Sequence, residues 1–373
     1  MPKLFMVVNE DRFFLSHRKD IALAAVKEGY DVTIIAKDTG SLDAIKKLGL
    51  KVLELPINPT GMNLVQEWHT FNFLLSLYHR DKPDIVHHVG LKNILWGGFV
   101  GRIAKVPGIV NAVSGLGGLF NDNHISLMTH GVLATMKYSN RRPGVKVIFQ
   151  NNDDLEIMRR YSVVCEEQIE FTKGSGVDLK EYAYCSPPQK GPLKIIFTGR
   201  MVKEKGVLDL IAAAELLRND FEDSVQFLLC GRTTPNKSGL SLEELQSLCD
   251  NKYICYLGER NDVKELLAQS HIMAFPSYYR EGVPRSLIEA SAVGRPIVTC
   301  DSTGCRDVVD EGINGFKIKP RDVKSLSSYL RKLIISPELR EKMGRAAREK
   351  AEKEFSIDKV VETHLRIYRE LSK

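Results

Sequence analysis

Short apolar runs rich in β-branched residues alternate with longer amphipathic segments along the chain. This alternation is typical of βαβ units, in which a buried parallel strand is followed by a helix that covers the sheet. In the first half, helical periodicity covers residues 18–28 and 65–79. The strands predicted there are residues 4–8, 32–36, 52–55, 85–88, 109–113, 145–149 and 168–171.

The second half repeats the same pattern with a purely helical end. Its predicted strands are residues 194–198, 226–230, 254–257, 272–275, 297–299 and 316–318. Pro337 is expected to start one late helix, and Phe355–Ser356 to separate it from a final one. The pattern predicts an α/β protein with two Rossmann-like, doubly wound parallel sheets that face a central cleft, with ligands bound outside the carboxyl ends of the strands.

A segment rich in proline and glycine divides the two halves. It reads YAYCSPPQKGPLK, in which Pro187, Pro188, Gly191 and Pro192 interrupt both strand and helix. The predicted boundaries are a first domain over residues 1–180, a linker over 181–192, a second domain over 193–354 and a C-terminal helix over 355–373 that crosses back to the first domain.

Composition fits a folded, water-soluble protein of two domains. The 373 residues are 43% hydrophobic and 27% charged. Residues 93–110 form the longest apolar stretch, but Arg102, Lys105 and Pro107 interrupt it, so we expect no membrane span. The start lacks the features of a signal peptide, and the seven cysteines contain no Cys-x-x-Cys pair. These features predict a cytoplasmic protein without a metal site.

The net charge of +6 favours anionic partners. Much of the excess lies between residues 101 and 150, where Asp122 is the single acid and the bases are Arg102, Lys105, Lys137, Arg141, Arg142 and Lys146. Such a segment suits peripheral docking to an anionic membrane, and it equally suits solvated helix ends. A role in nucleic-acid binding has no motif to support it.

Two cations follow the first predicted strand of the second half. Gly199 and Arg200 come directly after the strand, and Lys205 and Gly206 precede a helical pattern. A diphosphate needs positive compensation, which an arginine, a lysine and a helix N-terminus together supply. The same charges would stabilise a departing nucleotide diphosphate.

Two carboxylates eight positions apart occur further along, in EGVPRSLIE. Glu281 is expected on a loop and Glu289 one turn inside a helix. A carboxylate accepts hydrogen bonds from the vicinal hydroxyls of ribose, and the amides near Ser286 and Leu287 could meet a phosphate. Taken singly, a glutamate in the position of Glu289 is more often an ordinary exposed acid of a helix.

These motifs together resemble a known family. GRMVKEKG, YLGERNDV and FPSYYREGVPRSLIEA, in this order and spacing, are similar to the nucleotide half of the retaining glycosyltransferases of family four, which have the GT-B fold. FFLSHR, PDIVHHVGLKN, VSGLGGLF, QNNDDLE and GSGVDLKEY agree more loosely with the acceptor half. The resemblance extends to bacterial enzymes that build surface polysaccharides or lipid-linked oligosaccharides.

The resemblance implies roles for the residues that match its motifs. It implies a metal-independent hexosyltransferase without a cofactor, acting on a nucleotide sugar, expected to be a UDP-sugar, and on a saccharide or polyprenyl-diphosphate-linked acceptor, with retention of configuration. Arg200 and Lys205 would hold the diphosphate, Glu281 the sugar and Glu289 the ribose, with Arg260 near the base. The full predicted donor site is Gly199, Arg200, Lys205, Arg260, Glu281, Gly282, Val283, Ser286, Leu287 and Glu289, of which Arg200, Lys205 and Glu281 are also predicted to be catalytic.

The acceptor side departs from the family pattern. Many members have a glycine-rich loop after the first strand, where this chain has NEDRFFLSHR, and a His-x-His pattern where it has His87 and His88. Adjacent strand residues point to opposite faces, so one of these two histidines is expected to face the cleft. We favour His88, as a catalytic and acceptor-binding residue, because Lys92 follows it. The other predicted acceptor residues are His17, expected to open the first helix, and the glycines Gly115, Gly117 and Gly118, which equally fit a tight turn.

Other functional classes remain as alternatives. An NAD-dependent oxidoreductase would need a Gly-x-Gly-x-x-Gly turn after the first strand, which this chain lacks. A nucleotide-sugar epimerase of the same architecture would bind the same donor without an acceptor. A non-catalytic sugar-binding module is the third alternative.

Overall fold

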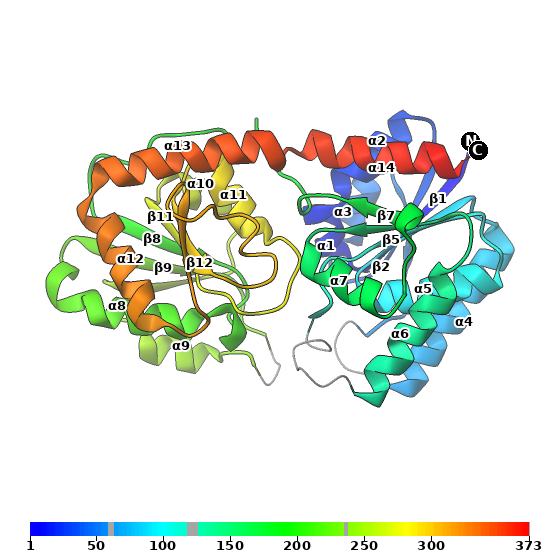
Figure 1. The fold of residues 1–373 in the computed structure, drawn as a ribbon, viewed down its shortest axis with the longest axis horizontal. Coiled ribbons are helices and arrows are strands. Elements are labelled where there is room, and N and C mark those ends of the chain that lie inside the picture. The colour runs from blue at the N-terminus through cyan, green and yellow to red at the C-terminus, as the bar shows by residue number, and fades with distance from the viewer. Residues whose placement is uncertain (59–62, 118–125, 235–237, 373) are drawn as a thin grey trace. The chain divides into compact units, whose positions relative to one another are not determined.

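A computed structural model describes residues 1–58, 63–117, 126–234 and 238–372 (Figure 1). These residues form two compact units. Unit 1 comprises Met1–Gly176 together with Ile357–Lys373, and unit 2 comprises Val177–Ser356. Each unit has its own sheet, as the sequence predicts.

The sheet of unit 1 is parallel, in the order β3-β2-β1-β4-β5-β6-β7. The order reverses between β1 and β4, so the loops after these two strands leave toward opposite sides of the sheet. The strands are β1 (Lys3–Glu10), β2 (Asp31–Lys37), β3 (Lys51–Glu54), β4 (Ile85–Val89), β5 (Gly108–Ala112), β6 (Val145–Phe149) and β7 (Ile169–Phe171).

Helices cover both faces of this sheet because its strands are apolar on both sides. Along β1, Phe5 and Val7 pack in the core beneath α4, α5 and α6, and Leu4 and Met6 pack in the opposite core beneath α2 and α14. The helices are α1 (Asp11–His17), α2 (Lys19–Lys27), α3 (Leu42–Lys47), α4 (Leu64–Asp81), α5 (Leu91–Ile103), α6 (Leu127–Asn140), α7 (Asn152–Arg160) and α14 (Ile357–Leu371), with a 3₁₀ turn η2 at Glu166–Gln168.

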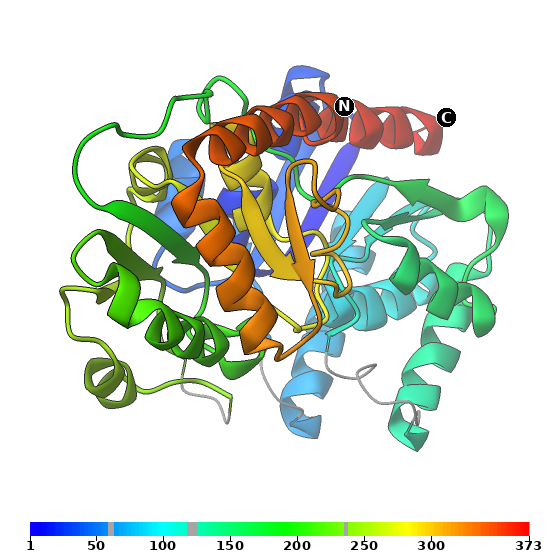
Figure 2. The same ribbon diagram turned by 60° about the vertical axis from the view of Figure 1, so that its left-hand side comes forward.

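Unit 2 has a six-stranded parallel sheet in the order β10-β9-β8-β11-β12-β13, reversing between β8 and β11. Its strands are β8 (Leu193–Thr198), β9 (Val225–Cys230), β10 (Ile254–Gly258), β11 (Ile272–Phe275), β12 (Ile297–Cys300) and β13 (Gly315–Ile318). Figure 2 shows α12 crossing in front of this sheet. The helices are α8 (Val207–Phe221), α9 (Leu242–Leu248), α10 (Val263–Ala268), α11 (Arg285–Val293), α12 (Val323–Ile335) and α13 (Pro337–Glu354), with a 3₁₀ turn η3 at Lys203–Lys205.

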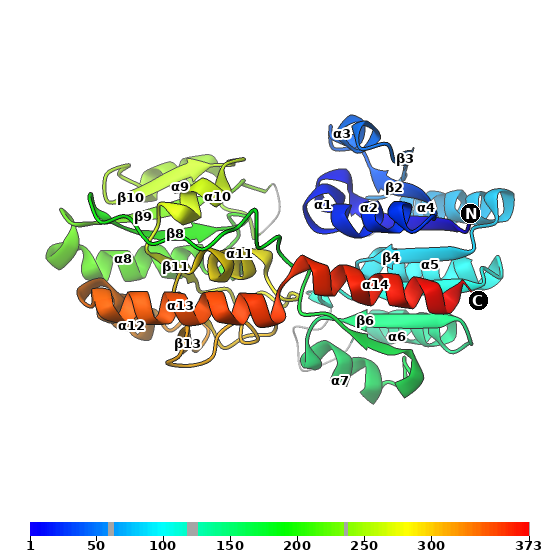
Figure 3. The ribbon, with the colours of Figure 1, turned by 90° about the horizontal axis from the view of Figure 1, so that it is seen from above.

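The predicted strands are all present, with ends shifted by at most two residues. The predicted return of the C-terminal helix is confirmed too, because α14 belongs to unit 1 and runs beside α2 (Figure 3). A buried hydrogen bond of 2.7 Å between Tyr368 Oη and His87 Nδ1 fastens α14 to β4.

The predicted domain boundary is shifted, and the predicted linker is part of unit 2. The chain passes from one unit to the other at Gly176–Val177. Residues 181–192 then pack on unit 2, where the buried guanidinium of Arg295 donates to the carbonyl of Cys185 at 2.9 Å and His271 Nε2 contacts the Pro188 carbonyl at 3.0 Å. Proline stops strands and helices but does not prevent packing, which explains the difference.

Membrane-spanning helices are not found among the four described ranges, because none of the helices there combines enough length with enough apolar character.

We predict that stability falls in acid because unit 1 buries neutral histidines. Burial lowers the pKa of His88 to about 4 and that of His364 to about 3, against 6.5 for the free side chain. As the pH falls, these histidines therefore bind protons in the unfolded chain at a higher pH than in the folded chain. The stability of the fold is unaffected by this difference above about pH 6.5, and it decreases as the pH falls below that value. Going from about pH 7.5 to about pH 5.5 should cost about 1.4 kcal/mol per histidine.

Urea unfolding at the two pH values measures this loss, and the His88→Gln variant is the control. The variant should lose about 1.4 kcal/mol less than the parent over the same interval. Equal losses in both proteins would contradict the assignment of a buried neutral His88.

Candidate functional site

The predicted donor residues gather at the carboxyl edge of the sheet of unit 2. Here β8 and β11 are neighbours at the point where the strand order reverses. Such a switch point leaves a crevice between two diverging loops, which is where open α/β sheets bind ligands. The loop after β8 carries Arg200 and Lys205, and the loop after β11 carries Glu281.

Backbone contacts hold these two loops together. The amides of Tyr278 and Tyr279 both donate to the Glu204 carbonyl, at 2.9 and 3.0 Å. Gly206 has a left-handed φ of 77° and lies so close to Pro276 that an added Cβ would be 2.2 Å from its carbonyl oxygen. The motif therefore needs glycine at this position for both conformation and space.

An ion pair joins the same loops through side chains. Lys205 Nζ lies 2.8 and 3.2 Å from the two carboxylate oxygens of Glu281, and Ser277 Oγ donates to that carboxylate at 3.1 Å. The ammonium also lies 5.0 Å from the centre of the Phe275 ring. Lys205 is only 8% exposed, so its charge is held in a sheltered site at the switch point.

Arg200 lies on the same loop, directly after Gly199. It is half-buried, and its guanidinium carbon is 6.0 Å from the centre of the Tyr279 ring. The structure thus brings a second cation to the loops that carry Lys205 and Glu281, as predicted.

Glu289 lies on α11, which starts directly after the Glu281 loop. It is buried, which excludes the alternative of an ordinary exposed acid. Arg285 Nε donates to its carboxylate at 2.7 Å, and the Tyr182 phenol lies close enough to feel its charge. Burial and the neighbouring Glu289 carboxylate raise the pKa of Tyr182, so this phenol stays protonated.

Most of the remaining residues of the EGVPRSLIE motif pack against the protein and are not exposed to solvent. Gly282 and Val283 are buried. The Gly282 carbonyl oxygen approaches Gly304 so closely that a Cβ added to Gly304 would be only 2.0 Å from it. The Leu287 amide donates to the Pro284 carbonyl at 3.1 Å, and its side chain is in the core. Leu287 thus belongs to the helix start and the core, whereas Ser286, like Arg285 before it, is half-exposed.

Arg260 lies apart from these loops. It follows β10, the edge strand, two strands away from β8, and its exposed guanidinium pairs with Asp262 at 2.6 and 2.8 Å. Its partner is thus Asp262, and no hydrogen bond or ion pair joins it to the other predicted donor residues, all of which lie in the described ranges.

The prediction that one histidine of β4 faces an open cleft is wrong. His88 is fully buried, and its ring nitrogens contact Asn111 Oδ1 at 2.9 Å and Tyr78 Oη at 3.0 Å. His87 is fully buried on the other face, against α14. A Cβ on Gly97 would be 2.3 Å from the His88 ring, so α5 needs glycine there to cover it. The His88 ring is therefore enclosed in the core of unit 1, where it contributes to packing and hydrogen bonding.

The other predicted acceptor residues lie near the carboxyl edge of unit 1. His17 ends α1 and does not open the first helix, because DRFFLSH is itself helical. Gly115 and Gly117 both have positive φ, 109° and 63°, as tight turns require. Lys92 is the second residue of α5 and is paired with Glu67 of α4. Gly118 lies outside the described residues.

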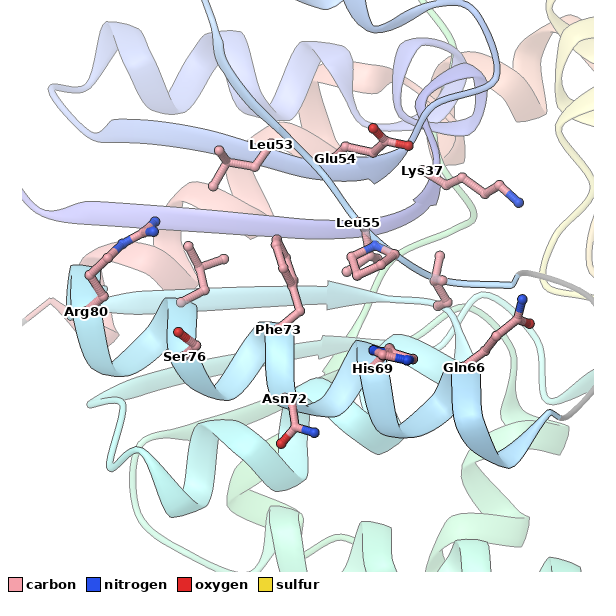
Figure 4. A pocket seen from close by; sticks show the side chains of 13 residues that line it. Lys37, Leu53, Glu54, Leu55, Gln66, His69, Asn72, Phe73, Ser76 and Arg80 are labelled. Carbon is pink, nitrogen blue, oxygen red and sulfur yellow. The ribbon is translucent and has the colours of Figure 1, made fainter.

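A cavity of about 790 Å³ lies elsewhere in unit 1, between β3 and α4 (Figure 4). Phe73 points toward Leu55 in its centre, Lys37 and Gln66 lie at one end and Arg80 lies at the other. None of the predicted acceptor residues lines it.

Two family models match most of the chain. One, described as glycosyl transferases group 1, matches residues 185–350, and the other, glycosyl transferase 4-like, matches residues 3–151. The chain is a glycosyltransferase of family four. The resemblance inferred from the motifs is thereby confirmed.

Two bacterial relatives align along much of this glycosyltransferase. N,N'-diacetylbacillosaminyl-diphospho-undecaprenol alpha-1,3-N-acetylgalactosaminyltransferase of Campylobacter jejuni is 26% identical, over 95% of this chain and 97% of the relative. UDP-Gal:alpha-D-GlcNAc-diphosphoundecaprenol alpha-1,3-galactosyltransferase of Escherichia coli is 25% identical, over 81% and 80%.

Solved structures confirm the GT-B fold of the glycosyltransferase. HepE of Anabaena, in complex with UDP-glucose, has a TM-score of 0.76 at 17% identity, with each chain covered completely. At this identity the likeness shows the fold alone.

Sequence reasoning did not single out several residues that shape the glycosyltransferase site. Tyr182 lies in the predicted linker, 107 positions before its partner Glu289, so no local pattern indicates it. Ser277 and Arg285 lie within the quoted motif, but spacing alone assigns them nothing. In unit 1, Arg18 is buried and donates to the His17 carbonyl and to Ser114 Oγ, which joins the end of α1 to the loop at Gly115.

We predict that Gly206→Ala destabilises unit 2 more than a matched glycine change. Gly258 is the control, because it has a similar φ of 68° and no described atom within 4 Å of an added Cβ. Gly258→Ala should cost only the left-handed strain of about 1–2 kcal/mol. Gly206→Ala should cost a further 1–3 kcal/mol or so because it collides with Pro276.

Urea unfolding of the two variants measures the difference. Equal losses would show that the contact between the two loops does not depend on glycine.

Proposed function

We propose that this glycosyltransferase moves a hexose-type sugar from UDP to a saccharide carried on a polyprenyl diphosphate, with retention of configuration and without a metal ion. The observation that carries the donor assignment is the grouping of Arg200, the sheltered Lys205–Glu281 pair and the buried Glu289 on two adjoining loops and one helix start. The acceptor assignment comes from the relatives.

The charges of the site suit a nucleotide diphosphate. Lys205 is held at the switch point with Arg200 on the same loop, so two cations are available to a pyrophosphate. Glu289 is a fixed, buried carboxylate and suits the paired hydroxyls of a ribose. Uracil as the base is supported by the name of the E. coli relative, which specifies UDP-Gal.

The relatives support the acceptor class. The names of both bacterial relatives specify a sugar linked to undecaprenol through a diphosphate. The C. jejuni relative aligns over almost the whole of both chains, so its acceptor half is represented here. An acceptor of this kind stays in the bilayer, so transfer would take place with the protein peripherally associated at the cytoplasmic membrane surface.

The chemistry needs positive charge where the donor breaks. The bond between the anomeric carbon and the phosphate oxygen opens, and its electron pair leaves with the diphosphate. Arg200 and Lys205 would stabilise that charge. The acceptor oxygen bonds the anomeric carbon, and its proton passes to the leaving phosphate. The anomeric configuration is retained if the acceptor attacks the anomeric carbon from the side on which the diphosphate leaves. Proton NMR of the product measures the configuration of the new linkage, and an inverted linkage would contradict retention.

We predict that Lys205→Met and Arg200→Met each weaken UDP binding about 10- to 100-fold, because each removes a charged contact worth about 1.5–3 kcal/mol. Isothermal titration calorimetry with UDP measures the effect. Lys203→Met is the matched control, since Lys203 lies on the same turn but is exposed.

The control should bind UDP as the parent does. If all three variants bind UDP alike, the diphosphate does not lie at this switch point. Because Lys205→Met leaves Glu281 without its cation, the double variant with Glu281→Gln separates lost attraction from added repulsion.

A further inference from the structure

The outer face of α4, α5 and α6 in unit 1 carries exposed apolar side chains that the proposed reaction does not use. We propose that this helical face docks on an anionic phospholipid bilayer. The reason for membrane binding rests on the proposed function, in which the acceptor is linked to a lipid. The choice of this face rests on its exposed side chains alone.

The N-terminal ends of two helices are apolar and exposed. Leu64 and Val65 open α4 and are 81% and 65% exposed, and Leu127 and Met128 open α6 and are 92% and 47% exposed. Figures 1 and 2 show both helix ends projecting from the same side of unit 1. Exposing four large apolar side chains on two projecting ends is costly in water and favourable in the acyl region of a membrane.

An aromatic band crosses the three helices behind these ends. Trp68 stacks on Phe71 at 5.8 Å between ring centres, Phe71 lies 6.0 Å from Phe99, and Phe99 lies 5.7 Å from Tyr138. The two ends of the band, Trp68 and Tyr138, are 63% and 51% exposed. Tryptophan and tyrosine favour the boundary between acyl chains and headgroups, because each has an apolar ring and a polar edge.

The charge of α5 and α6 complements an anionic surface. Neither helix contains an acidic residue. Arg102 lies 4.1 Å from the centre of the Tyr138 ring, and Lys137 and Arg141 form no ion pair with any carboxylate in the described ranges. Cations beside aromatic rings suit phospholipid phosphates.

Two of the basic residues in the segment 101–150, which the sequence suggested for membrane docking, are paired within the protein. Lys146 is paired with Glu170 and Glu370, and Arg142 is bonded to the carbonyls of Val106 and Pro107. These two charges stabilise the fold. The membrane contact is therefore assigned to the apolar helix ends and the aromatic band, with Lys137 and Arg141 as its cationic border.

A second copy of the chain fits this face less well. A twofold contact would place the face against itself. The acid-free helices α5 and α6 would then bring cations against cations. An anionic bilayer supplies the opposite charge without that penalty.

Co-sedimentation of the full chain with vesicles tests the assignment. The probes are vesicles of phosphatidylcholine alone and of phosphatidylcholine with about 30% phosphatidylglycerol. The test variant is Leu64→Ser with Leu127→Ser, and the matched control is Leu216→Ser with Leu242→Ser, two exposed leucines of unit 2. All four positions are exposed, so folding should survive, and thermal unfolding checks this.

The parent and the control should bind the phosphatidylglycerol vesicles more tightly than the neutral ones, and the test variant should lose at least tenfold or so in partitioning. Equal partitioning of the test variant and the parent, or no vesicle binding by the parent, would overturn the assignment. The assignment would also be overturned if the parent were a dimer, and the test variant were a monomer that binds vesicles as the parent does. The face would then join two copies of the chain.

UDP titration without vesicles separates this inference from the proposed function. Intact UDP affinity in the test variant, together with lost vesicle binding, supports the docking face. Vesicle binding by a parent chain that does not bind UDP would contradict the donor assignment and leave the docking face standing.

Discussion

A lysine held out of water at the switch point of one sheet is the constraint on which the proposed donor site depends. Lys205 is 8% exposed, and a cation in such a place needs a partner. Glu281 supplies it from the loop after β11, so the ion pair also fixes the distance between two loops that leave the sheet in opposite directions. Gly206 permits the close backbone contact that brings them together.

The same constraint explains the rest of the site. Once the loop after β11 is fixed, its continuation enters α11 and carries Glu289 into a buried position against Arg285 and Tyr182. The carboxylate therefore keeps one orientation before any ligand arrives. In the proposed function, cations and carboxylates fixed in this way would give a nucleotide a site that is formed in advance, which lowers the cost of binding.

Much of this could be predicted from the sequence because strands and motifs are local. The strands follow from short apolar runs, and Arg200, Lys205, Glu281 and Glu289 follow from one motif order. Two kinds of feature could not be predicted. Period-two alternation assigns His88 to a face but does not say that α5 seals that face, and the contact between Tyr182 and Glu289 joins residues far apart in sequence.

A crystal structure with UDP bound would show directly where the donor lies. We expect the diphosphate within hydrogen-bonding distance of Lys205 Nζ and the Arg200 guanidinium, with the ribose hydroxyls on the Glu289 carboxylate. UDP bound away from these three side chains, with the Lys205–Glu281 pair undisturbed, would contradict this placement.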